Sequence, residues 1–179
     1  MEFAYTVEEY IQDVSVQEFK AQCIDVERFR RLCEQCGNYN RRWSCPVFSF
    51  DPMEVWDGYS QLQLYMRLMR GTKPEQPMEA ALTALKEEKK KYFDLLMAWE
   101  SATPDSLMLS AGTCDLCGDI CRKALGKPCC HPEKLRYSIE ALGGNVEECA
   151  RRYFHTPVLW GRDGIAPDYY ILMGGLLMR

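Results

Sequence analysis

The sequence predicts an α+β fold in which a small mixed or antiparallel sheet has helices on one side and cysteine-rich metal-binding loops at one edge. Two observations support this prediction. Segments with the apolar patterns of strands alternate with segments whose apolar residues recur every three or four positions, as in helices. Cysteines are concentrated in two segments, separated by a stretch, 46–113, that has none. With 179 residues, of which 47% are apolar, we expect a single cysteine-rich domain over residues 1–179.

The elements of the first half follow from local patterns. Apolar spacing predicts short helices over 16–22 and 26–32, the second starting after Asp25 as its N-cap. Alternation of apolar and polar residues predicts a half-buried strand over 61–69. Spacings of three, four and seven then predict a long amphipathic helix over 78–99.

The second half continues in the same way. The short apolar segment 106–110 suits a buried strand that leads directly into the second group of cysteines. A helix is predicted over 133–142, and Asn145 is placed to cap another over 146–153. The final apolar run, 169–178, predicts the last strand and is too short to cross a bilayer.

Charge and cysteine content exclude several functions. Lys and Arg number 22 against 26 Asp and Glu, so no positive field attracts nucleic acid. The N-terminal segment is acidic and lacks the pattern of a signal peptide. We therefore expect a cytoplasmic protein that has neither nucleic acid nor membrane as a partner. In a reducing compartment, ten cysteines are expected to bind metal or perform redox chemistry instead of forming structural disulfides.

The main cysteine motif, residues 112–130, predicts a metal centre. Cys114, Cys117, Cys121 and Cys129 have the spacing C-x2-C-x3-C-x7-C, which brings four thiolates within sixteen residues. Sulfur-only sites suit iron–sulfur clusters and zinc. Because histidine is scarce and thiolates are in surplus, we favour a [4Fe–4S] cluster that transfers electrons to a redox protein partner or performs cluster-dependent redox chemistry. The alternative is a structural zinc module that mediates protein interaction.

The front motif, residues 33–45, predicts a second or shared site. Cys33, Cys36 and Cys45 have the spacing C-x2-C-x8-C and supply three ligands. The fourth position is filled by Cys23, Cys130 or Cys149, or is left open for substrate or water. In another arrangement, Cys45 joins the main motif as a remote ligand.

The remaining candidates surround these two motifs. Cys130 is expected to be a neighbour or alternate ligand, or to form a redox pair with Cys129, and His131 suits a zinc site with three cysteines. Cys23 and Cys149 are expected in the core. Basic residues near the motifs offset thiolate charge, hold an anionic substrate or only aid solubility; they are Arg41, Arg42, Arg122, Lys123 and Lys127.

In combination, these motifs resemble a family of short prokaryotic cysteine-rich proteins known as predicted metal-binding proteins of unknown function. The resemblance covers roughly residues 16–178. It implies a cysteine-ligated metal centre of the iron–sulfur kind in a cytoplasmic protein, and it implies no particular reaction. The residues that carry it are Cys33-x2-Cys36, Tyr39, Ser44-Cys45-Pro46, Gly112-x-Cys114-x2-Cys117-x3-Cys121, Pro128-Cys129, His131-Pro132 and Arg136-x-Ser138-x-Glu140-Ala141.

Overall fold

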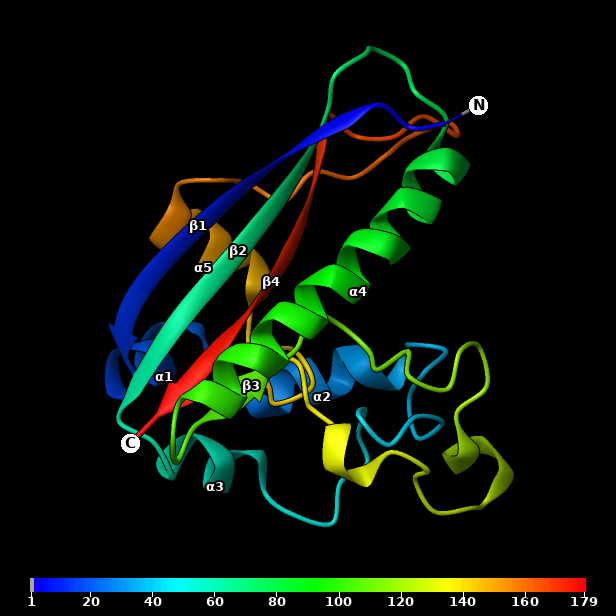
Figure 1. Ribbon diagram of the computed structural model, residues 1–179. Helices are drawn as coiled ribbons and strands as arrows, with labels where there is room; N and C mark the ends of the chain where they lie inside the picture. Colours follow the sequence, from blue (N-terminus) through cyan, green and yellow to red (C-terminus); the bar gives the residue numbers. More distant parts are fainter. Residues whose placement is uncertain (1) are drawn as a thin grey trace.

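The computed structural model describes residues 2–179, and Figure 1 shows a sheet, one long helix against it and a loop-rich end. The strands are β1 (Tyr5–Ser15), β2 (Gln61–Gly71), β3 (Leu107–Leu109) and β4 (Tyr169–Met178). The helices are α1 (Val16–Cys23), α2 (Val26–Glu34), α3 (Pro52–Asp57), α4 (Met78–Ala102) and α5 (Val146–Phe154), with 3-10 turns η1 (Arg122–Leu125) and η2 (Pro132–Lys134).

The four strands form one antiparallel sheet in the order β1-β2-β4-β3. Two glycines allow the strands to approach closely at β4. A Cβ atom on Gly174 would lie 2.2 Å from the Leu109 carbonyl oxygen, and one on Gly175 would lie 2.2 Å from the Gln63 carbonyl oxygen. The α+β class and the antiparallel sheet agree with the sequence prediction.

Helices cover both faces of this sheet, so the structure adds a second helical layer to the one that the sequence predicted. On one face α4 packs its Tyr92 and Leu96 against Met108 of β3 and Leu176 of β4 (Figure 1). On the other face lies a core to which α1, α3 and α5 contribute. The reason lies in β2, where buried side chains from 64 to 69 are consecutive and therefore point to both faces.

Side-chain caps begin four of the helices. Ser15 accepts a hydrogen bond from the backbone N–H of Glu18 in α1, Asp25 from Arg28 in α2, Asp51 from Met53 in α3 and Asn145 from Glu148 in α5. The predicted caps at Asp25 and Asn145 are confirmed.

Three elements differ from expectation. The edge strand β1 and the six-residue helix α3 were not predicted, because most of β1 is exposed and α3 is too short for a helical period. The predicted helix over 133–142 was wrong beyond η2. There the backbone of Tyr137 accepts from Ser110 N–H, and the Ser138 hydroxyl accepts from Ala141 N–H, so these residues pair outside a helix. Among residues 2–179, no helix combines the length and apolar character needed to cross a membrane.

Candidate metal centre

The main cysteine segment, residues 112–137, contains the main motif and begins at one edge of the sheet. It follows β3, one of the two edge strands, and its regular structure is limited to η1 and η2. Tight turns shape it. Gly118 and Gly126 both have positive φ angles, 69° and 65°, and each donates its N–H to a carbonyl three residues earlier. This placement of cysteine loops at one edge agrees with the prediction.

Arg42 connects the front motif to the main segment. Its guanidinium donates hydrogen bonds to the carbonyl oxygens of Cys114 at 2.9 Å, Gly118 at 3.1 Å and Asp119 at 3.0 Å. The neighbouring Ser44 hydroxyl accepts from Cys114 N–H at 3.0 Å. Two segments about 70 residues apart in sequence are therefore joined at the first cysteine of the main motif.

Trp43 and Lys123 make a second connection between the same segments. Trp43 donates its indole N–H to the Lys127 carbonyl at 3.2 Å, and the Lys123 ammonium lies 5.2 Å from the centre of the Trp43 ring. Lys123 also donates to the Val47 carbonyl at 3.1 Å. Among the basic residues near the two motifs, Arg42 and Lys123 thus hold the loops together.

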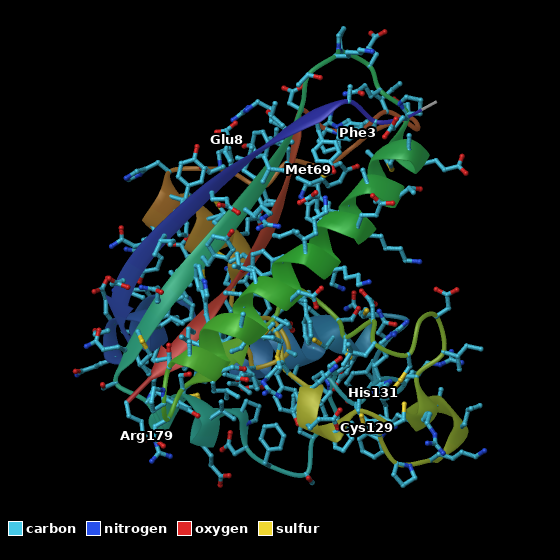
Figure 2. All side chains as sticks on the ribbon, in the orientation of Figure 1. Phe3, Glu8, Met69, Cys129, His131 and Arg179 are labelled. Atoms are coloured by element: carbon cyan, nitrogen blue, oxygen red, sulfur yellow. The ribbon has the colours of Figure 1, made fainter. Side chains whose placement is uncertain are left out.

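All four predicted ligands of the main motif line one small cavity. Its wall includes the four cysteines together with Trp43, Ser44, Leu116, His131 and Leu135. Figure 2 shows Cys129 and His131 together, far from Phe3 and Met69 at the opposite end of the molecule. The members of the motif are Cys114, Cys117, Cys121 and Cys129.

A more compact group lies at the same place and includes only one of those four. The ligand atoms of Cys117, Cys130 and His131 all lie within 4.8 Å of one another, and the Cys117 and Cys130 sulfurs are 3.1 Å apart. No other set of three or more His, Cys, Asp or Glu ligand atoms in residues 2–179 is this compact. The signal in the sequence is the adjacency of Cys130 and His131 to Cys129, which predicts Cys130 as a neighbour or alternate ligand or as a redox partner of Cys129, and His131 as a zinc ligand.

Two thiols of the main motif, those of Cys114 and Cys117, have raised pKa values and hold their protons at neutral pH. The hydrogen bond with Cys130 and then burial raise the pKa of Cys117 to about 11. Burial raises the pKa of Cys114, partly offset by a bond from Leu116 N–H. The backbone N–H of His131 also donates to the Cys129 sulfur at 3.4 Å. A metal that binds here must displace protons, so its affinity increases with pH.

The front motif lies beside the main segment but is less compact. Cys33, Cys36 and Cys45 interact electrostatically with one another: burial and then the charges of Cys45 and Cys36 raise the pKa of Cys33 to about 11. Cys45 is buried, whereas Cys36 is exposed. Their three sulfur atoms do not all lie within 4.8 Å of one another. The three cysteines are therefore neighbours, but their sulfurs are not close enough together to bind one ion as they stand.

Glu140 lies near this trio and has an unpaired carboxylate oxygen. Its negative charge contributes to the raised pKa of Cys33. Its Oε2 atom is buried and has no hydrogen-bond partner among residues 2–179, and burial raises the pKa of the carboxyl group. The sequence placed Glu140 on a helix after the cysteines, and no sequence signal indicated that this carboxylate is buried.

Cys23 and Cys149 belong to the hydrophobic core. Their exposed fractions are 3% and 0%, and they pack among apolar residues of α1 and α5 such as Phe19 and Ala150. The prediction that these two cysteines are core residues is confirmed.

Comparison with known families agrees with the metal-binding character of these loops. A family model described as "Predicted metal-binding protein (DUF2284)" matches residues 17–178, which is nearly the whole chain. No curated protein and no solved structure matches the chain. The cysteine and histidine group at the end of the main segment gives this description a structural counterpart. The chain therefore belongs to this family of predicted metal-binding proteins.

Proposed function

We propose that Cys114, Cys117, Cys121 and Cys129 bind a [4Fe–4S] cluster. The supporting observation is that all four cysteines line one cavity, while their sulfur atoms do not all lie within 4.8 Å of one another, as the ligands of a single ion would. Thiolates around a tetrahedral ion with metal–sulfur bonds of about 2.3 Å lie about 4 Å apart. Thiolates at the corners of a four-iron cluster lie further apart. The wider arrangement of these four favours the cluster.

The chain's own residues provide the surroundings that such a cluster requires. When bound, it would supply one-electron transfer. The N–H groups of Leu116 and His131 donate to the Cys114 and Cys129 sulfurs, and such bonds raise a cluster's reduction potential. Arg42 and Lys123 bring positive charge beside the thiolates. The role that follows is electron transfer to a redox protein partner, or cluster-dependent redox chemistry, in the cytoplasm.

The front motif belongs to the same proposal as a second or shared centre. Cys33, Cys36 and Cys45 supply three thiolates, and the Ser44 bond to Cys114 brings Cys45 close to the main motif. Three thiolates leave one metal position for another ligand. Removal of Cys36, the exposed member, is expected to reduce iron content while leaving the main centre occupied.

A second candidate function is a structural zinc site. The compact group of Cys117, Cys130 and His131 favours it, because two thiolates and an imidazole within 4.8 Å of one another suit one tetrahedral ion. In this case the metal would hold the loops in place for a protein partner.

Two adjacent cysteines give a matched pair of variants that distinguishes the candidates. Anaerobically purified protein is analysed for iron, acid-labile sulfide and zinc, and its visible spectrum is recorded before and after reduction. The cluster proposal predicts iron and sulfide, with a broad visible band lost in Cys129→Ser and retained in Cys130→Ser.

The zinc candidate predicts the opposite dependence. Colourless protein with stoichiometric zinc, lost in Cys130→Ser and His131→Ala but retained in Cys129→Ser, would overturn the cluster proposal. Circular dichroism of each variant checks that the sheet and helices are intact.

A further inference from the structure

A second, larger cavity lies between α4 and the beginning of the main cysteine segment. Its volume is about 500 Å³, within the range of small-molecule sites. One wall is formed by residues 86–94 of α4 and the other by residues 110–119. The proposed metal centre does not account for this cavity.

Only a short piece of chain separates this cavity from the cysteine cavity. Cys114 and Leu116 line both. A molecule in the larger cavity would therefore contact the residue that carries the first thiolate of the main motif. This position suits a substrate or effector of the centre, whichever metal occupies it.

The helical wall presents ammonium groups around an aromatic ring. Lys86, Lys89, Lys90 and Phe93 are spaced three and four residues apart, so they occupy one face of α4. Two acids of this wall, Glu87 and Asp94, form no ion pair with any of residues 2–179, and they lie roughly a quarter turn around the helix from the centre of that face.

The acids of the opposite wall are already matched by lysines. Lys89 donates to Asp115 and to the Thr113 carbonyl, which ties it to the loop. Lys86 lies 3.6 Å from Asp119, and both side chains are mostly exposed, so this pair is weak. Lys90 has no ion-pair partner among residues 2–179. Lys90 can therefore bind an anionic group directly, and Lys86 can do so by giving up its weak pair with Asp119.

We propose that this cavity binds a small amphipathic anion, that is, a molecule with a flat apolar body and one carboxylate, phosphate or sulfonate group. The body would lie between Phe93, Ala111 and Leu116, and the anionic group would accept hydrogen bonds from Lys86 and Lys90. The inference depends on the cavity and its charges and not on the identity of the metal.

A pair of fluorescent probes tests the site in the metal-containing protein as purified. 8-Anilinonaphthalene-1-sulfonate has an apolar body and one sulfonate, and N-phenyl-1-naphthylamine has a similar body without charge. We expect saturable binding of the sulfonate probe at one site. The double variant Lys86→Glu/Lys90→Glu should weaken it at least about tenfold, since two charge-assisted bonds become repulsion. The neutral probe should change less than about twofold.

The control is a double variant with the same change in net charge. Lys73→Glu/Arg162→Glu alters two exposed residues that line neither cavity, and it should leave both probes unaffected. Substitution Phe93→Ala should weaken both probes, because it removes the shared apolar wall. Equal effects of the two double variants on the sulfonate probe, or no saturable binding by the original protein, would overturn the inference. Metal analysis of the same samples shows separately whether the metal centre is intact.

Discussion

The sheet and the main cysteine segment are stabilised by different interactions. In the sheet, Leu62, Leu64 and Met66 of β2 are fully buried. In the segment, no residue from 112 to 137 is buried, and Ile120 and Leu125 are 65% and 59% exposed. Burial of apolar surface stabilises the sheet, whereas polar contacts from other elements position the segment.

This difference predicts which part of the molecule depends on metal. A region that buries little apolar surface cannot offset the conformational entropy of ordering its chain. Thiolate–metal bonds would supply the missing free energy in the segment and are not needed in the sheet.

Removing a core aromatic should destabilise the whole molecule. Trp56 is fully buried, packs 5.3 Å from the Phe19 ring and donates to the Leu142 carbonyl at 3.0 Å. We expect Trp56→Ala to lower the free energy of unfolding by about 3–5 kcal/mol, measured by urea denaturation. Trp160→Ala, at a site that is 77% exposed, should cost less than about 0.5 kcal/mol. Equal costs would contradict the role assigned to the core.

An ion pair anchors the end of the cysteine segment to α4. The Glu100 carboxylate accepts from Arg136 Nε at 2.8 Å and from Met108 N–H at 2.7 Å, and the Arg136 and Glu100 side chains are only 15% and 12% exposed. Glu100→Gln should cost about 2–3 kcal/mol of unfolding free energy, because it leaves Arg136 without its counter-charge. The control Glu27→Gln breaks an exposed pair with Arg31 and should cost less than about 0.5 kcal/mol.

The same pair should contribute to the pH dependence of stability. Burial raises the pKa of Glu100, but the Arg136 and Met108 bonds lower it more, so its folded-state pKa is below the ordinary 4.5. A lowered pKa stabilises the fold above pH 4.5, and this contribution is lost as the pH falls through the folded-state value. Urea midpoints between pH 3 and 7 should therefore fall more steeply toward acid in the original protein than in Glu100→Gln. Parallel curves would show that Glu100 makes no such contribution.

Loss of Arg42 should affect the segment more than the sheet. Arg42→Ala removes three hydrogen bonds to loop carbonyls, and we expect a cost of about 1–2 kcal/mol together with reduced metal content. Arg42→Lys keeps the charge but not the forked donor geometry, so it should recover only part of the metal content. Full metal content in Arg42→Ala would show that these bonds do not position the cysteines.

Removal of the metal should affect the cysteine segment and leave the sheet almost unchanged. Hydrogen exchange is expected to be faster after chelation at the amides of residues 112–137 and to stay unchanged in β2 and β4. The matched control is protein treated identically and then reloaded with metal, which should regain protection in the segment. Equal loss of protection in the strands would mean that the sheet also depends on the centre.

Local sequence patterns correctly predicted the elements that pack one side against the core. The apolar periods of α4, β2 and β4 are visible because each element packs against the core. In β1 most side chains are exposed at the edge of the sheet, so the alternation is weak and the strand was not predicted. Residues 133–142 contain helix-forming residues, but pairing of Tyr137 with Ser110 competes with the helix.

The sequence by itself determined the chemistry that the loops offer: soft sulfur side chains, in two groups, with short spacers within each. Short spacers limit how far apart neighbouring ligands lie, so sequence spacing is informative within a motif. Distances between segments depend on how they pack, and only the tertiary structure decided them. It joined Arg42 and Ser44 to Cys114 across about 70 residues, and it brought Cys130, and not Cys129, to 3.1 Å from Cys117. It also opened a cavity beside Cys114, because α4 is placed by its packing on the sheet and not by its position in the sequence.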